Sequence, residues 1–226
     1  MSIIIKKINN HFIFYDKDIG INIEELFLNK NFNRQERFET GIINNKKWFL
    51  KHYVRKGFMK FLGDMYLNTS IKKTRSYLEF ILLNDLYKKN FPTCKPIMGW
   101  LTKNKYTYKA NLISEYIPNV NLKAYIEQNK MKDNDWYLVG VLISNLHKQN
   151  VFHGDLNITN ILVSENNEER EKFILVDFDK SKNKSYLTVK EKSSNIDRVL
   201  RSLKKNNLYD KNSFNLLIKG YSFTND

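Results

Sequence analysis

The residues best suited to chemistry lie in the segment His153-Gly154-Asp155-Leu156-Asn157-Ile158-Thr159-Asn160, where an aspartate is followed five positions later by an asparagine. The apolar run Ile161 to Val163 comes next, and after a polar turn a second run, Phe173 to Val176, ends at Asp177. Two short strands joined in this way form a hairpin, which would bring Asp177 back beside Asn160. A carboxylate base next to amide and carboxylate ligands for a divalent cation favours phosphoryl transfer to a hydroxyl group.

An Asp-x-x-x-x-Asn loop of this kind is the catalytic loop of kinase-like phosphotransferases. We therefore predict that Asp155 is the catalytic base, that Asn160 and Asp177 hold Mg2+, and that ATP is the phosphate donor. An aspartate after a glycine is common in turns, so the tripeptide alone would carry little weight. The ordered series of loop, strand, turn and strand makes the interpretation specific. His153 is interpreted as a support of the loop backbone rather than a proton carrier, because Asp155 already fills the role of base.

Composition sets the class of protein. The chain has 226 residues, 42% of them hydrophobic, which suffices for one substantial core or two small lobes. Its single cysteine, Cys94, excludes internal disulfides and fits a reducing compartment. No apolar run approaches the roughly eighteen residues of a spanning helix, and the N-terminus lacks the features of a signal peptide, so we expect a cytosolic protein. The net charge of +14 indicates nucleic acid, an anionic membrane or a phosphorylated ligand as partner, although part of it reflects a lysine-rich composition throughout.

The pattern of elements predicts an α+β, two-lobed protein-kinase-like fold, with a small β-rich lobe (1–117), a mainly helical lobe (118–226) and ATP between them. Near the predicted hinge, Ser114 to Asn119, the backbone groups of Glu115 and Ile117 would bind adenine. In the first lobe we expect strands at Ile3 to Lys7, Phe12 to Tyr15, Trp48 to Val54 and Thr107 to Ile117, and a helix from Thr69 or Ser70 to Lys89. In the second lobe we expect helices at Asn121 to Asn129, Asp133 to Lys148, Val189 to Lys205 and Lys211 to Lys219.

A lysine and a glutamate are predicted to pair and to position the ATP phosphates. Lys51 is central in its strand and alternates away from Leu50. Glu79 interrupts the buried side of its helix, where a carboxylate is costly unless a cation pairs with it. We therefore expect Lys51 and Glu79 to form the phosphate-positioning pair of kinases. Protein kinases place a glycine-rich loop before this lysine, where the chain has only Gly41, so another segment is expected to cover the phosphates. The apolar stripe of the helix is predicted to comprise Ile71, Tyr77, Leu78, Ile81, Leu82, Leu83 and Leu86.

The acceptor is not expected to be a peptide. Protein serine/threonine kinases carry a lysine two positions after the catalytic aspartate, where this chain has Asn157, and a glycine where it has Asp179. The chain also has no Ala-Pro-Glu segment to build a peptide platform. The remaining acceptors are small molecules and sugars, so antibiotic kinases, choline-type kinases and the sugar kinases of lipopolysaccharide assembly are the relatives to consider.

Four segments resemble the 3-deoxy-D-manno-octulosonic acid (Kdo) kinases of Gram-negative bacteria. The most specific of them is Trp48 to Leu67, because a basic and aromatic run directly after the strand lysine is typical of this family. The resemblance implies that Asp155 is the base, that Asn160 and Asp177 are metal ligands, and that Lys51 and Glu79 form the phosphate-positioning pair. The family often has alanine where this chain has Gly154, a difference that we expect to matter little. The segments are Trp48 to Leu67, Thr74 to Leu86, Val151 to Leu162 with Ile174 to Lys180, and Arg198 to Lys205.

The resemblance implies ATP-dependent phosphorylation of the 4-hydroxyl of Kdo on Kdo-lipid IV A, by a peripheral protein at the cytoplasmic face of the inner membrane. Basic residues crowd the region 46–75 among aromatic and apolar ones, which suits a phosphorylated lipid in an anionic leaflet. Phe58 to Leu67 is expected to be an amphipathic helix that either enters the membrane interface or packs on the core. The candidate contacts to acidic groups of the substrate are Arg55, Lys56, Lys60, Lys73 and Arg75.

Other functions stay open at this point. One is a kinase of another lipopolysaccharide sugar, such as heptose, and a second is a small-molecule kinase of the aminoglycoside or choline type. A third is a catalytically silent kinase fold that binds membrane or RNA, which the net charge alone would favour. Asp155, Asn160 and Asp177 are all present and argue against a silent fold, and no nucleic-acid partner is expected.

Overall fold

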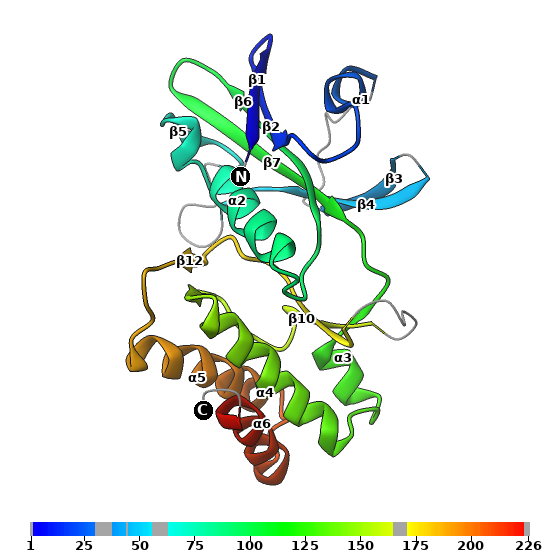
Figure 1. The fold of residues 1–226 in the computed structure, drawn as a ribbon, viewed down its shortest axis with the longest axis vertical. Coiled ribbons are helices and arrows are strands. Elements are labelled where there is room, and N and C mark those ends of the chain that lie inside the picture. The colour runs from blue at the N-terminus through cyan, green and yellow to red at the C-terminus, as the bar shows by residue number, and fades with distance from the viewer. Residues whose placement is uncertain (1, 30–37, 44, 56–62, 165–170, 224–226) are drawn as a thin grey trace. The chain divides into compact units, whose positions relative to one another are not determined.

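The computed structural model describes residues 2–29, 38–43, 45–55, 63–164 and 171–223 (Figure 1). The chain divides into two compact units, the first of residues 1–85 and 95–116 and the second of residues 86–94 and 117–226. Each unit has its own buried hydrophobic core.

The segment 86–94 belongs to the second unit, whereas the sequence-based division places it in the first lobe. Its backbone explains the difference. Leu175 N donates to Pro92 O at 3.0 Å, and Thr93 Oγ1 donates to Leu175 O at 2.9 Å. These bonds connect residues far apart in the chain, so no local pattern announces them.

The first unit is built on an antiparallel sheet with the strand order β1-β2-β6-β7-β4-β3, and β5 pairs with β7. The helical elements are α1 (Ile23–Asn29), a 3-10 turn (Ile71–Lys73) and α2 (Arg75–Lys88). The sequence-based prediction includes β1, β2, β4 and β7 and misses α1, β3, β5 and β6. β6 is buried on both faces over most of its length and therefore lacks the alternation that marks a half-exposed strand. The strands are β1 (Ile3–Ile8), β2 (His11–Asp16), β3 (Phe38–Ile43), β4 (Lys46–His52), β5 (Tyr66–Leu67), β6 (Pro96–Lys103) and β7 (Thr107–Glu115).

The two faces of this sheet carry different partners, because successive strand residues point to opposite sides. Trp48 and Leu50 of β4 join a hydrophobic core that includes residues of α1. On the other face, the ring of Phe14 meets that of Phe80 on α2 edge to face, with centroids 5.5 Å apart. Lys51 follows Leu50 and therefore points to the α2 side of the sheet.

α2 begins at Arg75, later than predicted. Thr74 is extended (φ −79°, ψ 150°) and separates the 3-10 turn from the helix. Leu78 is 55% exposed, so its place in the predicted apolar stripe is wrong. The buried face instead contains Glu79 together with Phe80, Leu82, Leu83 and Leu86. A helix turns about 100° per residue, so Leu78 lies about 110° around the helix axis from the centre of this buried face.

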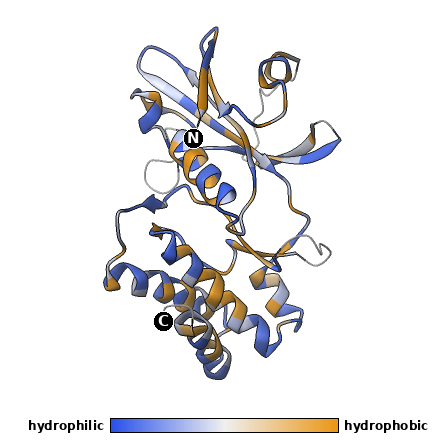
Figure 2. Ribbon diagram, in the orientation of Figure 1, coloured by the Kyte–Doolittle hydropathy of each residue, from blue (hydrophilic) through white to orange (hydrophobic). Residues whose placement is uncertain are grey.

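The second unit is mainly helical, with two small antiparallel sheets of order β11-β10-β8 and β12-β9. Hydrophobic residues, orange in Figure 2, run along α4, whose Val139, Ile143 and Leu146 are fully buried. The elements are β8 (Val120–Asn121), α3 (Leu122–Glu127), α4 (Asp133–Lys148), β9 (Val151–Phe152), β10 (Ile161–Val163), β11 (Phe173–Leu175), β12 (Lys182–Asn183), α5 (Val189–Lys205) and α6 (Lys211–Phe223).

The predicted hairpin is present in this unit. β10 and β11 pair antiparallel, with Ile161 opposite Leu175 and Val163 opposite Phe173. The segment 153–160 connects β9 to β10 and so emerges directly beside the end of β11. The predicted helices α3 to α6 are present too, and α5 begins at a capping box in which Thr188 and Glu191 bond each other's backbone, a signal readable from the sequence.

The predicted helix from Phe58 to Leu67 is not a helix at its C-terminal end. Tyr66–Leu67 form β5, which pairs with Tyr108 and Thr107 of β7, because the end of this run adds to the sheet instead of packing on it. Residues 56–62 lie outside the described residues. Among the described residues, no helix is both long and apolar enough to cross a membrane.

Candidate active site

The first unit holds the predicted lysine and glutamate pair. Lys51 Nζ lies 2.9 Å and 2.8 Å from the two carboxylate oxygens of Glu79, and the Tyr53 hydroxyl donates to Glu79 Oε2 as well. Both charged residues are buried, at 7% and 4% exposure. β4 supplies Lys51 from its α2 side and α2 supplies Glu79 from its buried face, so the alternation of the strand makes the contact. The pairing expected from the sequence is present.

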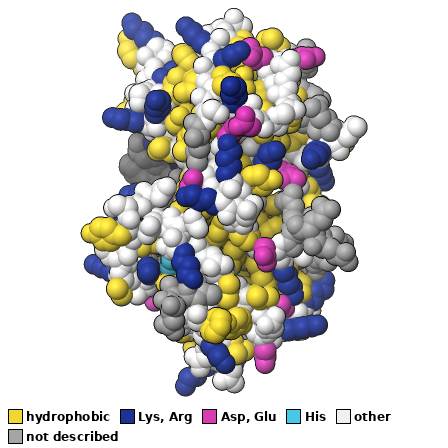
Figure 3. Space-filling model, viewed as in Figure 1, with side chains coloured by type: hydrophobic (Ala, Val, Ile, Leu, Met, Phe, Trp, Pro, Cys, Tyr) yellow, Lys and Arg dark blue, Asp and Glu magenta, His cyan; other side chains and the backbone are white. Residues whose placement is uncertain are grey.

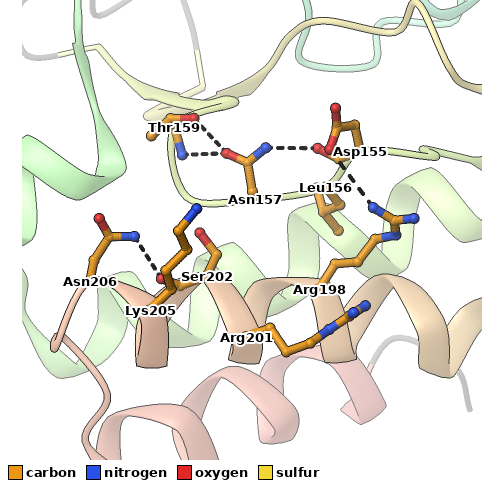
Figure 4. Close-up of a pocket in the computed structure, with 9 residues that line it drawn as sticks. All are labelled: Asp155, Leu156, Asn157, Thr159, Arg198, Arg201, Ser202, Lys205 and Asn206. Carbon is orange, nitrogen blue, oxygen red and sulfur yellow. Dashed lines mark hydrogen bonds and ion pairs between the residues drawn. The ribbon is translucent and has the colours of Figure 1, made fainter. Parts of the chain in front are cut away.

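The second unit holds the predicted base in a fixed orientation. Lys180 Nζ lies 2.8 Å from Asp155 Oδ2, and Arg198 lies on the other carboxylate oxygen, with its Nη1 3.8 Å from Oδ1 (Figure 4). One cation on each oxygen restrains the rotation of the carboxylate. Asp155 is only partly buried, so a substrate hydroxyl can reach it.

Asn157 and Lys180 together take the place of the lysine that serine/threonine kinases carry two positions after the catalytic aspartate. Asn157 Nδ2 donates to Asp155 O at 3.0 Å, and its Oδ1 accepts from Thr159 N at 2.9 Å. The asparagine therefore shapes the loop by closing local turns. The cation that position 157 lacks comes from Lys180, three residues after Asp177.

Gly154 is required where it stands. Its φ is +61°, and a Cβ at this position would lie 2.2 Å from Lys180 O. The expectation that alanine would matter little at Gly154 is therefore wrong for this chain. The left-handed backbone disfavours a side chain, and the close approach of the Lys180 backbone leaves no space for one. The same approach brings Lys180 to Asp155.

Asn160 and Asp177 lie at the paired ends of the hairpin. Asn160 Nδ2 donates to Asp155 O at 2.9 Å, which fixes the amide and turns Oδ1 away from that bond. Val176 N donates to Asn160 O at 3.0 Å, which places the next residue, Asp177, beside the loop. Asp177 has a φ of +62°, in the left-handed region that few residues other than glycine, asparagine and aspartate adopt. The donor set fits Mg2+, since an amide and a carboxylate oxygen leave room for phosphate oxygens and water.

His153 supports the loop, as predicted. The residue is fully buried, its Nε2 donates to Val176 O at 3.1 Å, and its ring packs on Phe178 with centroids 4.8 Å apart. Burial lowers the pKa of His153 to about 4, so the ring is neutral at pH 7. Its backbone N–H donates to Asn195 Oδ1 on α5 at 3.2 Å. The loop is thereby bonded both to the residue that follows β11 and to α5.

Comparisons with known proteins identify the family of the chain. The chain matches the family model described as lipopolysaccharide kinase (Kdo/WaaP) family over residues 28–221. The chain belongs to this family. Among the relatives of this lipopolysaccharide kinase, the 3-deoxy-D-manno-octulosonic acid kinase of Pasteurella multocida is 37% identical over 179 residues, which cover 76% of this chain and 73% of the relative. The enzyme of the same name from Mannheimia succiniciproducens is 33% identical over 213 residues, which cover 87% and 88%.

A solved structure supports the fold of this lipopolysaccharide kinase. WaaP, solved in complex with acyl carrier protein, aligns with a TM-score of 0.59 at 12% identity, covering 99% of this chain and 89% of WaaP. The predicted α+β, protein-kinase-like fold is confirmed. By its family, the chain is an ATP-dependent phosphotransferase that acts on a hydroxyl group.

Two residues of the lipopolysaccharide kinase are predicted to bind adenine. Glu115 ends β7, and its N–H already donates to Lys95 O at 2.8 Å within the sheet. Ile117 is buried, and its carbonyl accepts from the Asn119 side chain. The adenine contacts of Glu115 and Ile117 stay a prediction.

The predicted substrate contacts are only partly brought together. Arg55 and Arg75 both lie against the ring of Tyr66, at 4.7 Å and 5.3 Å, and Arg75 also donates to its hydroxyl at 2.8 Å. Lys73 is exposed on the 3-10 turn. Lys56 and Lys60 lie outside the described residues. Arg55 and Arg75 thus have a structural role beside any contact to substrate.

The sequence-based prediction missed Lys180, Arg198 and Tyr53 as members of the site. Lys180 ends the Asp-Phe-Asp-Lys string, and Arg198 begins the last segment of the family resemblance, so both stood in segments already singled out. Neither spacing nor residue type indicates that they meet Asp155. The contact depends on how α5 and the loop after Asp177 pack on the catalytic loop.

Proposed function

We propose that this lipopolysaccharide kinase transfers the γ-phosphate of ATP to the 4-hydroxyl of Kdo on Kdo-lipid IV A. The curated relatives at 33 to 37% identity, which are named as Kdo kinases, support Kdo as the acceptor. The observation that carries the chemistry is the Asp155 carboxylate, which has a cation at each oxygen, while the backbone carbonyl of Asp155 accepts from the Asn160 side chain at the start of the β10–β11 hairpin.

Each unit has its own task in the transfer. Asp155 orients the sugar hydroxyl and accepts its proton, while the hydroxyl oxygen attacks the γ-phosphorus and ADP leaves. Lys51, held by Glu79 and Tyr53, binds the phosphates of ATP and neutralises part of their charge. Asn160 and Asp177 would hold Mg2+, which neutralises charge on the phosphates when bound. Positioning and charge neutralisation account for most of the rate acceleration in such a mechanism.

The test is an acceptor panel with radiolabelled ATP. Kdo-lipid IV A, a heptose-bearing lipid, an aminoglycoside, choline and a generic peptide are offered separately, and the phosphorylated product is analysed by NMR for the modified hydroxyl. We expect transfer to Kdo-lipid IV A at the 4-hydroxyl and little to the others. Transfer to a different acceptor, or to another hydroxyl, would refute the corresponding part of the proposal. Asp155→Asn should abolish transfer and retain ATP binding.

We also propose that the enzyme works as a peripheral protein at the anionic cytoplasmic face of the inner membrane. Figure 3 shows lysine and arginine side chains across the visible face, with exposed hydrophobic side chains among them. Such a surface suits anionic headgroups. In a vesicle flotation assay, the wild type should bind phosphatidylglycerol vesicles and not phosphatidylcholine ones. The triple variant Arg55→Ser, Lys56→Ser, Lys60→Ser should bind less than the control Lys211→Ser, and equal binding would contradict the proposal.

A further inference from the structure

A row of basic side chains on α5 lines a cavity that starts at the catalytic base. The cavity has a volume of about 530 Å³ and lies within the second unit. Its loop side includes Asp155, Asn157 and Thr159, and its helix side includes Arg198, Arg201 and Lys205. In Figure 4, Arg198 and Lys205 reach from α5 toward the catalytic loop, and Arg201 extends along the helix. A cavity of this size can enclose a sugar unit.

The distance between this row and the base is fixed by bonds between α5 and the loop. Ile158 N donates to Ser202 Oγ at 3.3 Å, and His153 N donates to Asn195 Oδ1 at 3.2 Å. Asn195 also accepts from His147 Nε2 of α4 at 3.1 Å, so the helix is bonded on two sides. The helix that carries the basic row is therefore held at a fixed distance from the catalytic loop, and the side chains of Arg201 and Lys205 are exposed to solvent.

The cations of this wall outnumber the acids that face them. Arg198 approaches Asp155, and its Nε is shielded from solvent without a hydrogen-bond partner among the described residues. Arg201 Nε donates to Asp197 O at 3.2 Å, and no other hydrogen bond joins the Arg201 guanidinium to a residue that the structure describes. Among the residues that the structure describes, no acidic side chain pairs with Arg201 or Lys205. Asp155 is the one carboxylate on the described lining.

The size of the row matches one acidic sugar beside the base. Residues 198, 201 and 205 follow each other at three and four positions, so they lie on one side of the helix and span about 10 Å along its axis. The member of this row nearest to the base is Arg198, whose Nη1 lies 3.8 Å from Asp155 Oδ1. A sugar whose hydroxyl reaches Asp155 would therefore place an acidic group of the same ring within reach of this row, whereas a phosphate several sugars away would not.

We infer that Arg201 and Lys205 bind the carboxylate of the acceptor sugar and so fix which hydroxyl meets Asp155. The inference rests on the proposed function, which makes the acceptor a carboxylic acid sugar. Arginine binds a carboxylate through two parallel N–H···O bonds, which sets the orientation of the sugar as well as its affinity. Both residues are specificity-determining contacts. Arg198 has the additional task of orienting the base.

The test compares acceptors and variants of the full-length chain. Three acceptors are used: Kdo-lipid IV A, the same lipid with the Kdo carboxylate reduced to an alcohol, and the same lipid with its phosphates removed. The variants are Arg201→Gln, Lys205→Gln and, as control, Lys204→Gln. Lys204 is the neighbour of Lys205 on the same helix but lies over the Tyr209 ring, 5.1 Å from its centroid, and does not line the cavity. Initial rates give KM for the acceptor and kcat separately.

For wild type and control, reduction of the carboxylate should raise KM about ten- to hundredfold, the loss expected for hydrogen bonds to a charged group. Arg201→Gln should raise KM for the carboxylate acceptor by a similar factor, leave KM for ATP unchanged, and no longer discriminate between carboxylate and alcohol. Lys205→Gln should do so to a smaller extent. A merely structural role for Arg201 would change kcat and stability with all acceptors and would leave the discrimination intact.

Three results overturn the inference in distinguishable ways. An unchanged KM in Arg201→Gln and Lys205→Gln, with an active wild type, removes the subsite and leaves the proposed function standing. If the variants no longer discriminate between the lipid with phosphates and the phosphate-free lipid, but still discriminate between carboxylate and alcohol, the row binds a lipid phosphate. This result would refute the carboxylate assignment. A wild type inactive on every Kdo acceptor refutes the proposed function, and the subsite with it.

Discussion

The buried pair of Lys51 and Glu79 predicts an unfolding free energy that responds to pH in one specific direction when the lysine is removed. Lys51→Met keeps the length and most of the volume of the side chain but leaves the Glu79 carboxylate with the Tyr53 hydroxyl and without its cation. Removing one partner of a buried ion pair costs about 3 to 5 kcal/mol, because the remaining charge stays desolvated.

The cost has an upper limit, because the stranded carboxylate can take up a proton. A glutamate in an unfolded chain has a pKa of about 4.3, so burying it in the protonated form costs about 3.7 kcal/mol at pH 7 and about 1 kcal/mol at pH 5. We therefore expect Lys51→Met to lower the free energy of unfolding by about 3 to 4 kcal/mol at pH 7, close to this limit. At pH 5 the decrease should be only about 1 kcal/mol. The loss shrinks as pH falls, since protonation removes the unpaired charge.

The double variant Lys51→Met, Glu79→Gln isolates the pair. Its amide keeps a partner for the Tyr53 hydroxyl and carries no charge, so the double variant should recover to within about 2 kcal/mol of the wild type and lose the pH dependence. Lys109→Met is the matched control. Lys109 pairs with Asp64 at 2.9 Å on the surface of the same unit, and loss of such a pair costs about 1 kcal/mol or less.

The measurement is urea unfolding followed by tryptophan fluorescence. Trp48 and Trp100 are buried in the first unit, and Trp136 belongs to the second, so a Trp136→Phe background reports on the first unit alone. This selection matters because a chain with two compact units need not unfold in one step. A loss below about 1 kcal/mol at pH 7, or an equal loss at pH 5 and pH 7, would refute the reasoning that an unpaired buried charge sets the cost.

Three further predictions concern the catalytic loop. Gly154→Ala should lower the free energy of unfolding in urea by about 3 kcal/mol or more, because of both the positive φ and the contact at 2.2 Å. Gly20→Ala is the control: Gly20 has a φ of +73° but open space around it, so this variant should lose about 1 kcal/mol. Equal losses in the two variants would contradict the role of the close contact. Lys180→Met should lower kcat by about tenfold to a hundredfold, because the base is then misoriented. The midpoint of urea unfolding should stay unchanged, since the Lys180 side chain is 58% exposed. Lys182→Met is the control, and an unchanged kcat in Lys180→Met would remove Lys180 from the site. His153 has a pKa of about 4 in the folded protein, below its ordinary 6.5, so its contribution to stability is complete above pH 6.5 and falls by about 3 kcal/mol as pH falls to 4. In EDTA-containing buffer, the free energy of unfolding of His153→Gln should therefore depend less on pH over this window than that of the wild type. Parallel curves for the two proteins would contradict the assignment.

Much of the fold could be predicted because its signals are local. The hairpin of β10 and β11 is indicated by two apolar runs on either side of a polar turn. The start of α5 is marked by the capping box of Thr188 and Glu191. β6 and α1 could not be predicted in the same way. β6 is buried on both faces, which erases the alternation of a strand, and α1 is short and gains its stability from packing on the sheet.

The sequence by itself determined the chemistry of this protein. Asp155, Asn160 and Asp177 lie in one loop and one hairpin, so their spacing along the chain is enough to bring them together, and the pairing of Lys51 with Glu79 follows from a charge on each of two buried faces. Only the tertiary structure decided what holds the base and what surrounds it. Lys180, Arg198 and the basic row of α5 reach Asp155 through the packing of a helix and a return loop, and such packing depends on the whole core of the second unit rather than on the residues that meet.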